Sequence, residues 1–297
     1  MKLTKVVKKF RIDKPDKFRL SNFDPADNCG IDIDKAEAKA MLANGVERLS
    51  ALQEKLYAQN RWSVLIVFQA MDAAGKDSAI KHVMSGVNPQ GCQVHAFKAP
   101  SAEELDHDFL WRIAKALPER GRIGIFNRSH YEDVLVARVH PEILGRQRLP
   151  HDFMGKNIWD ERFKSIRHFE QHLARNGVLI VKFFLHVSKE EQRKRFLARL
   201  DEPAKRWKFE MNDVAERKRW EKYMKAYEDA IRHTGRPDAP WYVVPADNKP
   251  FARLVIAEAI VEAMENLKLE YPKVEGAALK ELSKVRHALE AEARKRK

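Results

Sequence analysis

A short apolar run followed by a glycine-lysine pair restricts the fold of this chain more than any other feature. Residues 63–69 read SVLIVFQ, the length of one strand, and AMDAAGKD follows over 70–77. A strand without polar alternation is typical of a parallel sheet that helices cover on both faces. A helical stretch follows as far as about residue 87. A strand, a loop that ends in glycine and lysine, and a helix together predict a phosphate-binding loop.

The same alternation of strand and helix continues along the chain. Further strands are expected over 92–97, 122–127, 177–187 and 241–246. Helical spacing of apolar residues predicts helices over 34–60, 102–117, 159–175, 188–200, 214–233 and 250–268. Five strands in this order predict an α/β protein of three layers, with a mostly parallel five-stranded sheet in the middle. Ligands of such a sheet bind at the carboxyl ends of the strands.

We expect three parts along the chain. Residues 1–33 are mixed in composition, with Pro15 and Pro25 interrupting any helix, and indicate an N-terminal arm. Residues 34–274 form the folded domain, and 275–297 form a basic C-terminal helix or tail. The formal net charge is +13, but residues 1–20 carry +6 of it and residues 280–297 carry +4. Basic ends are more often solvated than bound to a partner, so total charge does not identify one.

Composition and missing motifs exclude several classes of protein. The chain has no secretion signal and no run of 18 apolar residues, so we expect a cytoplasmic protein without a membrane segment. Cys29 and Cys92 belong to no CxxC pair, which argues against a zinc site. No RRM, KH, zinc-finger or helix-turn-helix signature is present, and we expect no nucleic-acid partner.

The loop over 70–77 departs from the usual pattern of Gly, four residues, Gly-Lys and Ser or Thr. Ala70 stands at the position of the first glycine, and Asp77 stands where the metal-binding hydroxyl is usual. Asp72 adds a second acid. The backbone N–H groups near the helix N-terminus, and Lys76, would bind phosphate oxygens. An ordinary strand-to-helix turn is the alternative, which the position of Gly75 and Lys76 disfavours.

The strand over 122–127 ends in a second polar segment, NRSHYED. It supplies Asn127, Arg128, Glu132 and Asp133. A carboxylate is expected near this strand end, because a phosphoryl-transfer site uses acids to hold a magnesium ion. The candidate metal-binding acids of this chain are then Asp72 in the loop and, beyond the strand, either Asp133 or Glu132. The alternative is that residues 132 and 133 start a solvated helix, where acids are common.

A third polar segment, over 193–213, breaks between two helices at Pro203. Cationic residues surround Trp207 and Phe209 there, namely Arg195, Arg199, Lys205, Arg206 and Lys208. Phosphoryl-transfer enzymes often close such a segment over the phosphates. We therefore expect a helical lid over about 199–213. The alternative is a solvated basic helix end with both aromatic rings in the core.

Together these segments resemble the polyphosphate kinase 2 family. Its phosphate loop reads DAAGKD, as residues 72–77 do, and its second motif reads NRSxY, as residues 127–131 do. Residues 86–112 and 123–141 are most similar to the class III branch, whose members phosphorylate AMP and ADP. The similarity runs from about 23 to 274. An aspartate at position 77 is usual for the family, whereas Ala70 stands where the family more often has glycine.

The resemblance implies a P-loop kinase fold like that of thymidylate kinase, with a helical lid. It implies reversible, Mg²⁺- or Mn²⁺-dependent transfer of the terminal phosphoryl group of polyphosphate to AMP and ADP. GMP and GDP are further candidate acceptors, and we expect a homodimer or homotetramer. Carried over to this chain, the catalytic residues are Asp72, Lys76, Asp77, Arg128 and Asp133, with the metal held by Asp72 and Asp133.

The resemblance also implies the residues that bind each substrate. Polyphosphate is assigned to Ala73, Ala74, Gly75, Lys76, Lys81, Arg199, Arg206 and Lys208. The nucleotide is assigned to Lys98, Asn127, Arg128 and Glu132. Lys98 belongs to the segment FKAPS over 97–101, which otherwise is a strand end turned by Pro100. A linear polyphosphate has no base to bind, so its site must be basic, and residues 188–236 carry a net charge of +5.

Three other functions compete with this hypothesis. An ATP-dependent nucleotide kinase of the same fold is the nearest, and Asp77 and the displaced acid argue against it. A nucleic-acid-binding protein with basic ends would leave the phosphate loop unexplained. A non-catalytic polyphosphate sensor would not need the full set of lysine and acids. The sequence does not decide between AMP and ADP, the preferred chain length or the oligomeric state.

Overall fold

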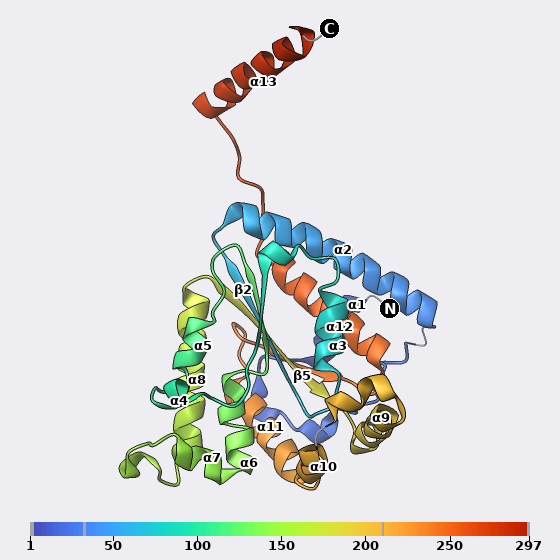
Figure 1. Ribbon diagram of the computed structural model, residues 1–297, viewed down its shortest axis with the longest axis vertical. Coiled ribbons are helices and arrows are strands. Elements are labelled where there is room, and N and C mark those ends of the chain that lie inside the picture. The colour runs from blue at the N-terminus through green and yellow to red at the C-terminus, as the bar shows by residue number, and fades with distance from the viewer. Residues whose placement is uncertain (1–2, 32–33, 210, 296–297) are drawn as a thin grey trace.

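A six-stranded sheet forms the middle layer of the protein (Figure 1). The structure is a computed structural model, and it describes residues 3–31, 34–209 and 211–295. The strand order is β1-β6-β5-β2-β4-β3, and every pair is parallel except β1 with β6. The strands are β1 (Arg11–Ile12), β2 (Ser63–Ala70), β3 (Cys92–Ala96), β4 (Ile123–Asn127), β5 (Val178–His186) and β6 (Trp241–Pro245). The five predicted strands are confirmed, and β1 is an addition.

Helices cover both faces of the sheet, as predicted. One face carries α1 (Leu3–Phe10), α2 (Lys35–Gln59), α3 (Lys76–Val83) and α12 (Lys249–Glu265). The other carries α4 (Ala102–Leu105), α5 (Trp111–Lys115), α6 (Val136–Val139), α7 (Pro141–Arg146), α8 (Ile158–Arg175) and α11 (Trp220–Thr234). Short 3-10 turns follow several strands, among them η4 (His130–Asp133) after β4.

Strand β2 lies at the centre of the sheet because both of its faces are apolar. Its residues Val64, Leu65, Ile66 and Val67 are fully buried. From β2 the chain builds outward to β4 and β3 on one side and to β5 and β6 on the other. The loop after β2 therefore sits where the strand order changes direction, which is where sheets of this kind bind ligands.

Two helices expected to be continuous are divided. The segment over 102–117 forms α4 and α5, because the Asp108 carboxylate accepts a hydrogen bond from the Leu110 N–H at 2.9 Å and holds a turn between them. The segment over 214–233 forms α10 (Met211–Arg217) and α11, with a turn at residues 218–219. Helix α3 also ends at Val83, four residues earlier than predicted. The segment predicted as a lid, over about 199–213, comprises the end of α9 (Lys189–Asp201), η6 (Pro203–Lys208) and the start of α10.

The N-terminal residues form a helix and a strand where the sequence predicted none. Helix α1 ends before Pro15, and its buried residues Val6, Val7 and Phe10 pack on the domain. The Thr4 hydroxyl donates to Glu258 of α12 at 2.9 Å, and β1 extends the sheet beside β6. At the other end, α13 (Ala277–Lys295) stands clear of the body (Figure 1). Among the helices that the structure describes, none has the length and apolar composition to cross a lipid bilayer.

Candidate active site

The phosphate loop joins β2 to α3 through two residues with left-handed backbone. Ala73 has φ 61° and Gly75 has φ 109°, a value that only glycine adopts without strain. Ala70, at the position of the usual first glycine, is an ordinary strand residue. The Lys76 ammonium donates to the Ala70 carbonyl at 3.0 Å and so lies across the loop. Strained backbone at Ala73, a non-glycine residue, is the kind of feature that collects at functional sites.

Helix α9 fixes this loop from outside. The Arg195 side chain, 6% exposed, uses all five of its N–H donors. It donates to the carbonyls of Ala73 at 3.1 Å and Ala74 at 2.7 Å, to those of Ala246 and Asp247 after β6, and to Glu191. Three carbonyls in a row are held, because the Gln192 amide also donates to the Asp72 carbonyl at 2.9 Å.

In a trans peptide the N–H points away from the C=O, so the Gly75 N–H, which follows the Ala74 carbonyl, faces away from Arg195. The Ala74 N–H is used within the loop, where it donates to the Met71 carbonyl at 3.2 Å. Sequence patterns grouped Arg195 with the cations of the segment over 193–213 but assigned it no ligand. In the structure its five donors are used by four backbone carbonyls and by Glu191, so none is left for a phosphate.

Strand β4 brings a second set of side chains to the loop. It pairs with β2 in a register that sets Asn127 opposite Phe68, so β4 ends two residues before β2 does. The Arg128 guanidinium lies 3.3 Å from the Asp72 carboxylate. The Asn127 amide donates to Asp77 at 2.7 Å, which joins β4 to the first turn of α3. Arg128 also has left-handed backbone, with φ 66°.

Glu132 is the acid of η4 that faces this group. Its carboxylate accepts a hydrogen bond from the Gln69 amide, at the end of β2, at 3.0 Å. Burial raises the pKa of Glu132, and Arg128, Lys76 and the Gln69 bond oppose the rise. Burial has the opposite effect on a cation and lowers the pKa of Lys76. The Asp72 carboxylate opposes this lowering most strongly. Two cations and two acids therefore converge on one side of the phosphate loop.

The structure does not bring Asp133 to this group. Its carboxylate, 6% exposed as a residue, accepts from the Gln147 amide at 2.5 Å and lies 3.6 Å from the Arg162 guanidinium. Burial raises the pKa of Asp133, and Arg162 is the largest opposing influence. Adjacent residues of the tight η4 turn point in different directions, so only one of the two predicted acids reaches the loop.

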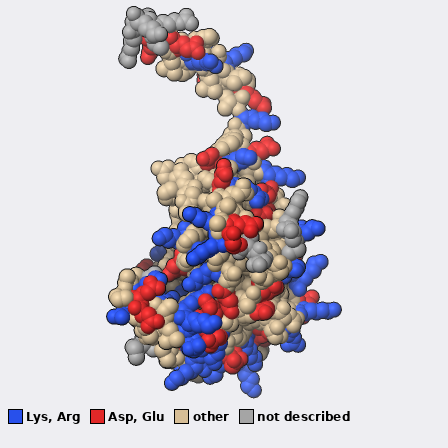
Figure 2. Space-filling model, turned by 90° about the vertical axis from the view of Figure 1, so that its right-hand side faces the viewer, with Lys and Arg blue, Asp and Glu red and all other residues tan. Residues whose placement is uncertain are grey.

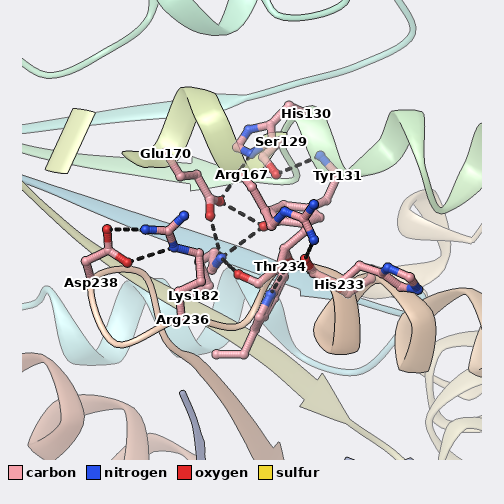
Figure 3. A network of polar contacts seen from close by, with 12 residues as sticks. Ser129, His130, Tyr131, Arg167, Glu170, Lys182, His233, Thr234, Arg236 and Asp238 are labelled. Atoms are coloured by element: carbon pink, nitrogen blue, oxygen red, sulfur yellow. Dashed lines mark hydrogen bonds and ion pairs between the residues drawn. The ribbon is translucent and has the colours of Figure 1, made fainter. Parts of the chain in front are cut away.

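A buried polar network holds the η4 turn against the sheet (Figure 3). The Lys182 ammonium, fully buried in β5, lies 2.6 Å from Glu170 of α8 and donates to the Tyr131 hydroxyl at 3.0 Å. The Tyr131 hydroxyl in turn donates to Glu170 at 2.8 Å. Tyr131 immediately precedes Glu132, so the network fixes the backbone that carries the acid. The lysine inside an apolar strand was the one sequence signal for it.

Comparison with known proteins assigns the family. The model of polyphosphate kinase 2 (PPK2) matches residues 32–272. The chain belongs to the polyphosphate kinase 2 family. A relative from Rhodopseudomonas palustris, named ADP-polyphosphate phosphotransferase, is 54% identical over 283 residues, which cover 95% of this chain and 98% of the relative. One from Meiothermus ruber, named AMP/ADP-polyphosphate phosphotransferase, is 44% identical over 92% of this chain and 98% of its own.

A solved structure agrees with this assignment. The crystal structure of polyphosphate kinase 2 from Arthrobacter aurescens is 40% identical and has a TM-score of 0.85, covering 94% of this chain and 96% of that one. The predicted family, fold class and enzyme class are therefore confirmed. The roles of individual residues remain predictions, which the geometry supports to different degrees.

The predicted lid residues of this polyphosphate kinase 2 family member make other contacts here. The Arg206 guanidinium donates to the Leu200 carbonyl at 2.7 Å on an exposed surface. Arg199 lies 3.9 Å from Asp213. The side chain of Lys208 lies outside the described residues. Trp207, which one alternative placed in the core, is 77% exposed. The contacts of Arg199 and Arg206 are therefore with residues of their own segment and not with the phosphate loop.

The remaining predicted residues lie at the edges of the site. Lys98 is exposed, and the buried Arg112 donates to its carbonyl at 2.9 Å, which fixes the end of β3. Lys81 is exposed on α3, one helical turn beyond Asp77. The sequence did not predict Tyr227 of α11, whose hydroxyl has a pKa raised by burial and by the nearby Glu132. A tyrosine in an amphipathic helix gives no signal of that position.

Proposed function

We propose that this protein transfers the terminal phosphoryl group of inorganic polyphosphate to AMP and ADP, giving ADP and ATP. The observation that carries the proposal is the convergence of Asp72, Lys76, Arg128 and Glu132 on a phosphate loop whose backbone is fixed by α9. Family membership and the printed names of the relatives supply the substrates. One phosphoanhydride bond is broken and one is formed, so we expect the reaction to be reversible.

The site supports transfer mainly by positioning and by charge. The nucleotide phosphate is already ionised at neutral pH, so its oxygen attacks without a general base. Lys76 and Arg128 stabilise the negative charge that spreads over the transferred group. Lys76 sits in the loop itself, and Arg128 reaches it from β4, so the two cations approach the phosphate from different strands.

A divalent metal ion fits this site if substrate phosphates supply the remaining ligands of its coordination shell. Mg²⁺ is usually bound by one or two carboxylates, with substrate phosphates and water as the other ligands. Within the described residues no group of three or more His, Cys, Asp or Glu could hold a metal alone. Asp72 and Glu132 are the carboxylates that face the loop, and we assign Mg²⁺ or Mn²⁺ to them. When bound, the metal neutralises charge on the phosphates.

We assign the two substrates to the two sides of β2 at the carboxyl edge of the sheet. Arg128 and Lys98 follow β4 and β3, so the side of β4 and β3 is assigned to the acceptor nucleotide. The lid and the loop after β6 lie on the other flank, which is assigned to polyphosphate. We infer that AMP and ADP are both acceptors and that the enzyme acts in the cytoplasm as a homodimer or homotetramer.

One assay tests this function. Purified protein, stripped of polyphosphate, is incubated with Mg²⁺, polyphosphate and AMP, ADP, GMP or GDP, and the products are resolved by chromatography. We expect ADP and ATP from the adenine acceptors, and none from a Lys76→Met control. Transfer from ATP to AMP without transfer from polyphosphate would show an ATP-dependent kinase instead. Binding of polyphosphate without turnover would show a sensor.

A further inference from the structure

A lysine and a glutamate are buried beneath the candidate active site, and the proposed function uses neither of them. Most charged side chains lie at the surface, and Figure 2 shows basic and acidic groups mixed across one face. Lys182 of β5 and Glu170 of α8, by contrast, are 0% and 1% exposed. Burial lowers the pKa of Lys182, because an ammonium without water is costly, and Glu170 is the largest opposing influence. Apolar residues of similar volume in place of such a buried pair often leave a protein equally stable or more stable, so stability does not explain the pair.

Both members of the pair are bonded to one point of the η4 turn, the Tyr131 hydroxyl (Figure 3). This hydroxyl accepts from Lys182 at 3.0 Å and donates to Glu170 at 2.8 Å. The ammonium of Lys182 also donates to Glu170 at 2.6 Å and to the Thr234 carbonyl, in the last turn of α11, at 2.9 Å, which uses all three of its donors. The position of the hydroxyl is therefore fixed from β5, α8 and α11 at once.

The chain between β4 and Tyr131 has a strained backbone. Arg128 is left-handed, with φ 66°, a conformation that a residue with a Cβ adopts only at a cost in free energy. Its N–H donates to the Phe68 carbonyl at 3.0 Å, so one end of the segment is attached to β2. The other end is attached at Tyr131, through the buried pair. Without this second attachment the strained backbone would relax, and the Arg128 and Glu132 side chains would turn away from the phosphate loop.

We propose that Lys182 and Glu170 are positioning residues of the phosphoryl-transfer reaction. Through the Tyr131 hydroxyl they hold Arg128 and Glu132 in the orientation that faces the phosphates. This inference rests on the proposed function, because it concerns the same site. Neither buried residue touches a substrate, so the phosphate loop still binds polyphosphate without them. Their loss therefore lowers turnover more than it weakens substrate binding.

A variant without buried charge in this network separates positioning from stability. Lys182→Met, Glu170→Leu and Tyr131→Phe are combined in a triple variant, so that neither a charge nor the hydroxyl is left buried without its partner. Tyr131→Phe alone is the second variant, because it removes one hydroxyl and leaves the ion pair in place. The control combines Arg48→Met with Glu258→Leu, which removes the ion pair of 2.8 Å between α2 and α12 on the other face of the sheet.

Steady-state kinetics, melting temperatures and amide hydrogen exchange are measured for each variant. The triple variant should melt no more than about 5 °C below wild type. Its kcat should fall about 10²-fold, while its KM for polyphosphate changes less than about threefold. Exchange over residues 126–136 should become faster, because the turn has lost its attachment. Tyr131→Phe should lower kcat about tenfold, and the control should keep the wild-type kcat.

A folded triple variant with wild-type kcat, or with unchanged exchange over residues 126–136, would overturn the positioning role. If the triple variant does not fold, Tyr131→Phe decides: wild-type kcat and exchange would overturn the role, whereas lower kcat with faster exchange would support it. Failure of the wild-type protein to transfer from any polyphosphate would instead overturn the proposed function. The exchange measurement needs no substrate, so it tests the attachment of the turn in either case.

Discussion

At the scale of single residues, the turn after β4 separates two acids that are adjacent in sequence. Glu132 faces the phosphate loop through Gln69, whereas Asp133 is buried against Arg162 and Gln147. The physical consequence of losing each charge is therefore different. One loss weakens the stabilisation of phosphates, and the other leaves a buried guanidinium without its counter-charge.

We expect Glu132→Gln and Asp72→Asn to lower turnover by about 10²- to 10⁴-fold with little change in stability. Asp133→Asn should instead lower the free energy of unfolding by roughly 2–4 kcal/mol, because Arg162 stays buried and uncompensated. Steady-state kinetics and urea unfolding of all three variants measure the contrast. A stable, inactive Asp133→Asn enzyme would return the metal to Asp133.

Asp77 presents the other residue-scale question, since it lies in the first turn of α3 and also accepts a hydrogen bond from the Asn127 amide. Asp77→Asn keeps an oxygen for the Asn127 amide but removes the charge. We expect turnover to fall by about 10²-fold, while the loss of the helix-terminal charge costs only about 0.3–1 kcal/mol of stability. Asp77→Ser, measured beside it, restores the conventional motif. Nearly full activity in both variants would make Asp77 structural.

Sequence patterns predicted those site residues that lie near the carboxyl end of a strand. Arg128 directly follows β4, and Lys76 follows the loop after β2, and parallel strands place such positions at one edge of the sheet. The choice between Glu132 and Asp133 depended on the direction of side chains in a 3-10 turn, which periodicity does not reveal. The role of Arg195 depended on carbonyls more than 100 residues away along the chain.

At the scale of elements, α9 connects the lid to the phosphate loop. Its inner side chains, Gln192 and Arg195, hold loop carbonyls, and the Arg217 side chain of α10 donates to Gln192 at 3.0 Å. Movement of the lid is thereby linked to the loop that binds phosphate. The predicted helix over 188–200 was correct in its extent, and its inner side chains Gln192 and Arg195 contact the backbone of the phosphate loop.

Arg195→Lys tests this connection. A lysine has three donors on one nitrogen and cannot reach two pairs of carbonyls, so several buried acceptors lose their partners. We expect the free energy of unfolding to fall by about 2–4 kcal/mol and turnover to fall by more than tenfold. Arg193→Lys, on the exposed side of the same helix, is the matched control. Equal effects of the two substitutions would contradict the role of Arg195.

The outer part of the lid should behave in the opposite way. Arg206 is exposed and donates to the Leu200 carbonyl within the same segment, so Arg206→Ala should leave the melting temperature nearly unchanged. If the lid closes over polyphosphate, turnover falls by roughly 10²-fold. Lys194→Ala, an exposed change in α9, controls for the loss of one charge. Full activity of the Arg206 variant would assign η6 to a solvated surface.

At the scale of the whole molecule, the N-terminal segment and the sheet are joined near the donor flank. The sequence predicted an arm because Pro15 and Pro25 interrupt any helix, and neither the two-residue strand β1 nor the short helix α1 gives a clear periodicity. The segment nevertheless adds β1 to the sheet, and the Asp247 N–H donates to the Pro25 carbonyl at 3.1 Å. His186, the last residue of β5, is buried close to this junction, with Asp24 and Asp247 nearby.

Burial lowers the pKa of His186 to about 4, from an ordinary value of 6.5, because the charged imidazolium would lose its hydration. Between these values the unfolded chain binds a proton that the folded protein does not, so stability is full above pH 6.5 and is lost as pH falls toward 4. We expect protonation of His186 to lower the free energy of unfolding by about 2–3 kcal/mol between pH 7 and pH 4.5.

Urea unfolding at both pH values measures this loss of stability. His186→Gln should reduce the acid-induced loss by that amount, whereas His172→Gln, at an exposed position of α8, should not. An unchanged loss in His186→Gln would show that other groups cause the acid sensitivity.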